Sequence, residues 1–217
     1  LFFYFILDTP ISYRVAFRHF RAGDMTTALE LVDKAIAARP DFWESYQLRA
    51  LIFLTELDFS RAERSAKEAI IRKPNAHPVY NTLGQVYLAE TRFDKAQTSF
   101  AQALELDPGN ALYRYHLALC HFRLENYREA AATFMEAISG SLRFLEYELQ
   151  AHYYLWRCLV ALGEIDQAKT VHEKMQAFAE GVPLIQEQLG DQPDYPHLPH
   201  LQADAADLSQ QFKQRET

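Results

Sequence analysis

The sequence contains little glycine and little cysteine. Only 7 of its 217 residues are glycine, whereas helix-favouring Ala, Leu, Glu, Gln and Arg occur throughout. This balance favours an all-α fold over strands. The two cysteines, Cys120 and Cys158, exclude a framework of several disulfides. Because both fall at the same place of neighbouring sequence repeats, about one helix spacing apart, we expect buried free thiols.

The sequence also lacks a basic excess and catalytic motifs. Its formal net charge is −7, and because phosphate binding needs clustered Lys and Arg, we expect no nucleic-acid partner. It has no GxSxG, P-loop, dinucleotide glycine run or HExxH. His197 and His200 offer two ligands where a zinc site usually has at least three. We therefore expect no enzyme, metal, cofactor or small-molecule substrate.

Long apolar runs are scarce as well. Residues 1–8 begin with seven apolar residues, whereas a helix that crosses a bilayer needs about twenty. They could form the end of a membrane span that begins upstream, because Arg14, Arg18 and Arg21 follow at the distance over which positive charge sets topology. We expect a cytoplasmic protein, with residues 1–8 either tethering it to the cytoplasmic face of a membrane or packing on the first repeat.

Alanine, by contrast, recurs at regular intervals. The spacings between successive members of this column are 34, 34, 34 and 38 residues, and the members are Ala28, Ala62, Ala96, Ala130 and Ala168. Units that begin at residues 9, 43, 77, 111 and 149 bring further apolar columns into register, and Pro40, Pro74 and Pro108 close the first three units. The chain therefore consists of five repeated units.

Within each unit, apolar residues recur at spacings of three and four, which predicts two short amphipathic helices. Paired helices approach most closely where side chains are small, so we expect Ala96 to lie against Gly84, at the eighth place of its unit. A leucine at that eighth place should overpack the contact by about 1–3 kcal/mol. Four extra residues precede Leu149, so the second helix of the fourth unit should end near Gly140 and the next helix should begin with an extension.

The third unit carries a recognisable motif: Tyr80-x-x-Leu83-Gly84-x-x-Tyr87, Ala96-x-x-x-Phe100 and Pro108. This pattern resembles the tetratricopeptide repeat, with Tyr in place of its Trp. The other units match less fully. The resemblance implies a right-handed α-solenoid of five helix-turn-helix repeats over residues 9–182, and a generic helical bundle is the alternative.

Residues 183–200 should form a proline-rich linker. Residues 201–217 should form an amphipathic helix that either caps the last repeat or lies in the protein's own groove.

In the family that this chain resembles, the first helix of each unit lines a concave surface that receives peptides or partner helices. The corresponding positions here are aromatic and aliphatic with few charges, and the cations with which some members hold a terminal carboxylate are missing. An apolar partner helix or an extended segment with apolar anchors fits this lining better. The candidate partner-binding residues are Tyr13, Phe17, Gln47, Leu51, Asn81, Gln85, Tyr115, His116, Leu119, Tyr153, Tyr154 and Arg157.

The resemblance thus implies a non-catalytic scaffold for protein–protein interaction. One alternative is a structural subunit or assembly factor built permanently into a larger, membrane-embedded complex. Another is a self-inhibited adaptor in which the helix of residues 201–217 occupies the groove.

Overall fold

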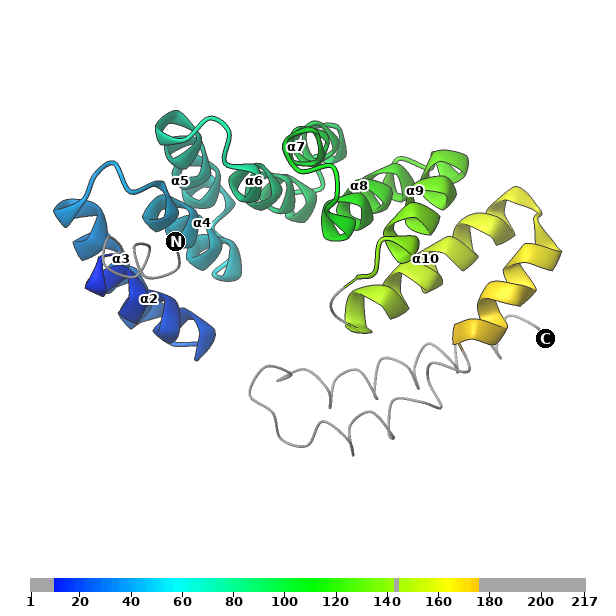
Figure 1. Ribbon diagram of the computed structural model, residues 1–217, viewed down its shortest axis with the longest axis horizontal. Helices are drawn as coiled ribbons and strands as arrows, with labels where there is room; N and C mark the ends of the chain where they lie inside the picture. The colour runs from blue at the N-terminus through cyan, green and yellow to red at the C-terminus, as the bar shows by residue number, and fades with distance from the viewer. Residues whose placement is uncertain (1–9, 143–144, 176–217) are drawn as a thin grey trace. The chain divides into compact units, whose positions relative to one another are not determined.

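The computed structural model describes residues 10–142 and 145–175, which form helices and turns without a strand (Figure 1). The predicted all-α fold is confirmed. Predictions for residues 1–8, 183–200 and 201–217 lie outside the described residues. The helices are α2 (Ile11–Arg21), α3 (Met25–Ala38), α4 (Trp43–Thr55), α5 (Phe59–Arg72), α6 (His77–Ala89), α7 (Phe93–Leu106), α8 (Ala111–Arg123), α9 (Tyr127–Ser139) and α10 (Leu145–Leu162), and residues 165–175 are helical too.

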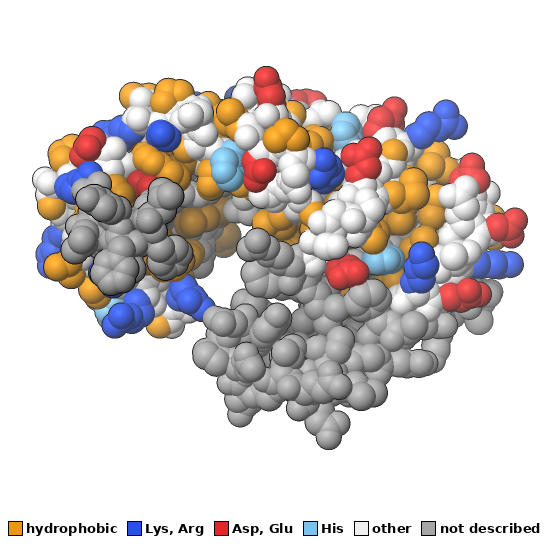
Figure 2. Space-filling model, in the orientation of Figure 1, with side chains coloured by type: hydrophobic (Ala, Val, Ile, Leu, Met, Phe, Trp, Pro, Cys, Tyr) orange, Lys and Arg blue, Asp and Glu red, His pale blue; other side chains and the backbone are white. Residues whose placement is uncertain are grey.

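The chain divides into two compact units, Leu1–Cys120 and His121–Thr217, with the boundary inside α8. In the first unit the closest packing joins α2 to α3, α4 to α5 and α6 to α7, while α3 contacts α4 and α5 contacts α6. In the second unit α9 packs against α10. Sequential helix pairs are the architecture that the repeat predicts. Apolar, acidic and basic side chains are interspersed on the face seen in Figure 2.

The turn inside each pair has the same geometry in all five repeats. The residue at the fifteenth place has a positive φ, and the next residue donates its N–H to the carbonyl five residues back, as Asp58 does to Phe53 at 2.9 Å. This is the Schellman arrangement that ends helices. Only two of the five turn residues are the glycines that this conformation favours: Gly23 (φ 81°), Leu57 (61°), Thr91 (60°), Glu125 (62°) and Gly163 (76°).

A leucine in this conformation costs stability, and Leu57 is 71% exposed, so little packing compensates. We expect Leu57→Gly to raise the free energy of unfolding by about 0.5–1 kcal/mol, because relief of about 1–2 kcal/mol of left-handed strain exceeds the entropy that glycine adds to the unfolded chain. Chemical denaturation measures the change. The reverse substitution, Gly23→Leu, is the matched control because a side chain there meets nothing within 4 Å. It should destabilise through the backbone alone, and a neutral result for both variants would contradict the explanation.

Successive pairs are joined at the closing prolines. The hydroxyl of Tyr46 donates to the carbonyl of Pro40 at 3.1 Å, and that of Tyr80 to the carbonyl of Pro74 at 2.9 Å. The Arg114 guanidinium donates in the same way to Pro108. Tyr46, Tyr80 and Arg114 occupy the fourth place of their units, so a polar side chain at this place ties α4, α6 and α8 to the turn before each of them.

The four-residue insertion lengthens a helix, as predicted. Helix α9 ends at Ser139 with Gly140 as its C-cap residue, and α10 begins at Leu145, four residues ahead of Leu149. As a result α10 has 18 residues, whereas α4, α6 and α8 have 13 each.

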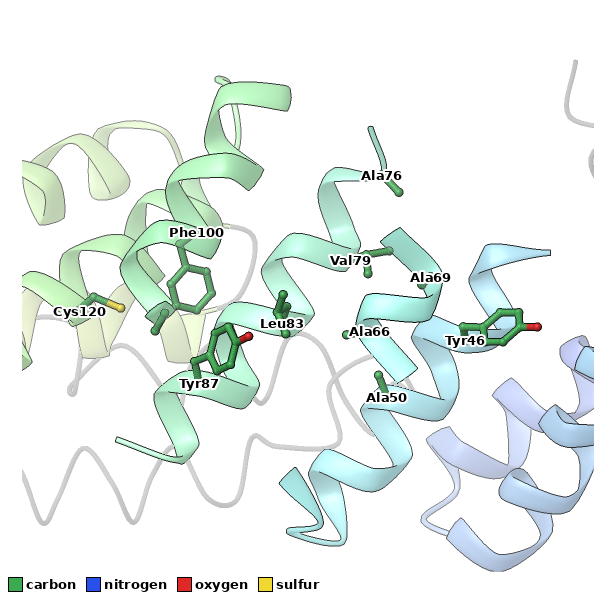
Figure 3. Packing of buried hydrophobic residues seen from close by; sticks show 11 residues of the cluster. Tyr46, Ala50, Ala66, Ala69, Ala76, Val79, Leu83, Tyr87, Phe100 and Cys120 are labelled. Atoms are coloured by element: carbon green, nitrogen blue, oxygen red, sulfur yellow. The ribbon is translucent and has the colours of Figure 1, made fainter. Parts of the chain in front are cut away.

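The alanine column is buried in every unit: Ala28, Ala62, Ala96 and Ala130 are 0% exposed and Ala168 is 3% exposed. In the first compact unit, a core cluster that spans several repeats extends from Tyr46 on α4 through Leu83 on α6 to Phe100 on α7 (Figure 3). A Cβ added to Gly84 would lie 2.5 Å from the ring of Phe100, which is one turn beyond Ala96 on α7, so this ring is a close neighbour of Gly84.

A charged cluster on α5 connects one helix pair to the next. The Glu63 carboxylate accepts hydrogen bonds from the Tyr87 hydroxyl at 3.0 Å and from Arg92 at 2.9 Å, and Lys67 lies 2.7 Å away. The guanidinium of Arg92 also lies over the Tyr87 ring, 4.5 Å from its centroid. Partial burial opposes ionisation of Glu63, but hydrogen bonds from Lys67, Arg92 and Tyr87 outweigh it and lower its pKa to about 2.

Cys120 and Cys158 are free and buried, as predicted. Burial raises the pKa of each thiol to about 12, so neither is a thiolate at neutral pH.

Among the described residues, none of the helices combines the length and the apolar character that crossing a bilayer requires.

Candidate functional site

The predicted partner-binding residues all lie on the first helix of their repeat. In the first compact unit, Tyr13 and Phe17 are on α2, Gln47 and Leu51 on α4, and Asn81 and Gln85 on α6. Phe17 is 42% exposed, and the other five are partly buried. Tyr115, His116 and Leu119 follow on α8, where only Leu119 keeps intermediate exposure.

Hydrogen bonds link these first helices to one another. The Gln47 amide donates to the Thr82 hydroxyl at 3.2 Å, and Asn81 Oδ1 lies 2.8 Å from His116 Nδ1. In both pairs a residue at the fifth place meets one at the sixth place of the next repeat. The polar residues predicted to bind a partner therefore also fix the spacing between repeats.

Two of the predicted residues are in the interior. Tyr115 is 3% exposed and His116 is 5% exposed, and the His116 imidazole stacks on the Phe100 ring with 5.0 Å between centroids. Burial lowers the pKa of His116 to about 3, so the ring is neutral at physiological pH. Both side chains belong to the packing between helices, and we leave them out of the accessible surface.

In the second compact unit, the predicted residues of α10 gather around an aromatic cluster. The ring centroids of Tyr154 and Phe122 are 5.0 Å apart, and those of Tyr153 and Tyr154 are 5.3 Å apart. The Arg157 guanidinium lies over two of these rings, 4.8 Å from the centroid of Phe122 and 5.8 Å from that of Tyr153. Such cation–π contacts hold the guanidinium in place while its N–H groups remain available as donors.

A cavity of about 500 Å³ adjoins this cluster. Its wall is mainly apolar, and two of its aliphatic side chains are well exposed, Val160 at 44% and Ile165 at 51%. The lining residues come from the end of α8, the start of α9, the second half of α10 and the helical residues 165–175: Phe122, Tyr127, Trp156, Arg157, Val160, Ala161, Ile165, Ala168, Lys169 and His172.

The charges on this cavity are of one sign. Arg157 and Lys169 line it together with His172, and none of the described carboxylates does. Within residues 10–142 and 145–175, neither Arg157 nor Lys169 forms an ion pair. An apolar wall with cations beside it suits a ligand that combines an apolar group with a carboxylate.

The family model for the tetratricopeptide repeat matches residues 18–77 and 81–141, which together are more than half of the chain. The chain is a tetratricopeptide repeat protein. The predicted family is thereby confirmed. No curated protein matches the chain.

Solved tetratricopeptide repeat structures share the fold at low identity. A chain of MamA from Desulfovibrio magneticus RS-1 that runs from residue 41 to the end superposes with a TM-score of 0.64 at 19% identity, covering 85% of this chain and 99% of that one. TTC0263, a thermophilic TPR protein from Thermus thermophilus, superposes with a TM-score of 0.64 at 19% identity, covering 90% of this chain and 97% of the TTC0263 chain. YrrB, described as a TPR protein with an unusual peptide-binding site, superposes with a TM-score of 0.61 at 16% identity, covering 77% of this chain and 84% of the YrrB chain. At such identities the likeness shows the fold alone.

The cavity lies where the fifth repeat departs from the tetratricopeptide pattern. The eighth place is Ala or Gly in the first four repeats, whereas here it is Trp156, whose ring centroid is 6.5 Å from that of His172 on the facing helix. The positions predicted from the family included Arg157 but not Val160, Ile165 or Lys169. The signal for them in the sequence is Trp156 itself, a large side chain where close helix contact requires a small one.

Proposed function

We propose that this tetratricopeptide repeat protein is a non-catalytic scaffold that binds a peptide or helix of a partner protein, and that the cavity beside Trp156 receives part of that partner. The observation that carries the proposal is the cavity of about 500 Å³, with exposed Val160 and Ile165 at its wall. Its volume falls within the range of about 300–1,000 Å³ that is usual for ligand sites. Exposed aliphatic side chains around an aromatic floor favour an apolar anchor.

The proposed ligand has one large apolar side chain and at least one nearby carboxylate. The apolar side chain would pack on Trp156 and Val160, and the carboxylate would accept hydrogen bonds from Arg157 or Lys169. In the first compact unit, the proposal retains the partly or well exposed residues of the predicted surface: Tyr13, Phe17, Gln47, Leu51, Asn81, Gln85 and Leu119. Tyr153 and Tyr154 complete the surface in the second unit.

Tetratricopeptide repeats generally bind proteins or peptides, which supports this function over the others considered. The rival, a structural subunit or assembly factor of a larger complex, would cover the same apolar surface permanently. We also propose that residues 1–8 tether the chain to the cytoplasmic face of a membrane, since Arg14, Arg18 and Arg21 follow their seven apolar residues at the distance over which positive charge sets topology.

The test is selection of peptides from a random phage-displayed library on the purified full chain. We expect the selected peptides to share an apolar anchor flanked by Asp or Glu. Val160→Asp and Ile165→Asp should each weaken their binding at least about tenfold, because a charge then borders the apolar anchor. Fluorescence anisotropy of labelled peptides measures the affinity.

Ile71→Asp is the matched control, because Ile71 on α5 is an apolar residue that is 76% exposed and lies outside the cavity lining. It should leave peptide affinity unchanged. Peptides that bind the two cavity variants as tightly as the wild type would show that the contact is elsewhere. If no peptide is selected, but a partner co-purifies stoichiometrically and does not dissociate, the permanent subunit is the better account.

A further inference from the structure

Helix α2 presents a cationic face to solvent. Arg14, Arg18 and Arg21 are all exposed and follow one another at spacings of four and three residues, which places them on one side of the helix. Residues 9–23 contain no Asp or Glu. In a chain with a net charge of −7, this face is a local concentration of positive charge.

The edges of the arginine face are apolar. Ile11 is 78% exposed and Phe17 is 42% exposed. Each is three residues from Arg14, so they flank the arginines on the same side of α2. The opposite side is packed: Ala16 is 0% exposed and belongs to a core cluster with Ala28 and Val32 of α3.

We propose that this outer face of α2, made of Ile11, Arg14, Arg18 and Arg21, binds the anionic surface of a lipid bilayer. Arginines with apolar residues beside them are typical of helices that lie in the bilayer interface, where the guanidinium groups contact phosphates and the apolar side chains enter the acyl boundary. Figure 2 shows Lys and Arg side chains along the lower left of the view, over the region that holds α2 in Figure 1.

A lipid surface explains the face better than an acidic protein does. An acidic protein would account for the arginines, but it gives no reason for the seven apolar residues that end three residues before α2. The inference rests on the proposed tether in one respect: residues 1–7 would bring α2 to the bilayer. It adds a contact of different chemistry, which depends on anionic lipid and weakens with salt.

The test is co-sedimentation of the full chain with vesicles of phosphatidylcholine alone and of phosphatidylcholine with 30 mol% phosphatidylglycerol, a fraction of about one lipid in three that gives a strongly negative surface. We expect tighter binding to the anionic vesicles. The triple variant Arg14→Glu, Arg18→Glu, Arg21→Glu should lose roughly a hundredfold of that binding and should bind neutral vesicles as the wild type does. The control reverses three other exposed cations, Lys34, Arg64 and Arg123, and should retain nearly all the binding.

The two proposals fail in different ways. Wild-type binding to both kinds of vesicle with equal affinity, unchanged in the triple variant, would overturn the role of α2 while supporting the tether. Binding to anionic vesicles alone, lost in the triple variant, would support α2 and count against the tether. If the triple variant instead loses binding to polyglutamate but not to anionic vesicles, the face recognises acidic protein and the lipid proposal is wrong.

Discussion

Replacing Phe100 by alanine is expected to lower the free energy of unfolding by about 3–5 kcal/mol, the usual cost of removing a buried phenylalanine. Phe100 is 0% exposed and lies in the core cluster that joins α4, α6 and α7. Its ring occupies the space that Gly84 leaves open and stacks on His116. Urea denaturation followed by circular dichroism measures the loss.

The specific contact with Gly84 is tested by a second substitution. Gly84→Leu alone should destabilise by about 1–3 kcal/mol, because its Cβ would lie 2.5 Å from the Phe100 ring. In the Phe100→Ala background the same leucine enters the vacated space, so it should cost less or become stabilising. Strict additivity of the two effects would contradict the packing of Gly84 on Phe100.

The Glu63 cluster predicts acid sensitivity. The pKa of Glu63 is lowered from 4.5 to about 2, so its contribution to stability is fully present above pH 4.5 and is lost as the pH falls toward 2. We expect about 1–2 kcal/mol from this residue, less than the shift alone would give, because solvent screens the partly exposed ion pairs. Loss of the cluster would loosen the connection between α5 and α6.

The measurement is the free energy of unfolding of wild type and Glu63→Gln between pH 6 and pH 2.5. Wild type should lose more stability than the variant over this range, so that the two curves converge in acid. Glu30→Gln, at an exposed position of α3, is the control and should run parallel to the wild type. Parallel curves for Glu63→Gln would show that the cluster contributes nothing that depends on protonation.

The repeat could be predicted from the sequence because its alanines are a steric requirement repeated in every unit. Gly23 and Gly163 are of the residue type that favours a positive φ, whereas the residue types of Leu57, Thr91 and Glu125 do not indicate one. These three adopt the left-handed conformation because the Schellman hydrogen bonds on either side impose it. The contact between Gly84 and the Phe100 ring was not predictable either, since the sequence does not show how far α7 slides along α6.

The prediction of the partner-binding surface was less complete than the prediction of the repeat. Mapping positions from the family selected residues on the first helix of each repeat, and among them Tyr153, Tyr154 and Arg157 lie in the aromatic cluster beside the cavity. It could not show that Tyr115 and His116 are buried, because burial depends on the rings packed over them. It also could not show a cavity, which arises where one unit breaks the rule that the others obey. Trp156 was visible in the sequence as the one large residue at the eighth place of a repeat. The cavity beside it became visible only in the structure.

A crystal structure of the full chain with the tightest selected peptide tests the central claim most directly. The account predicts an apolar peptide side chain packed against Trp156, between Val160 and Ile165, with a peptide carboxylate within hydrogen-bonding distance of Arg157 or Lys169. A peptide bound elsewhere, with the cavity beside Trp156 unoccupied, would contradict it.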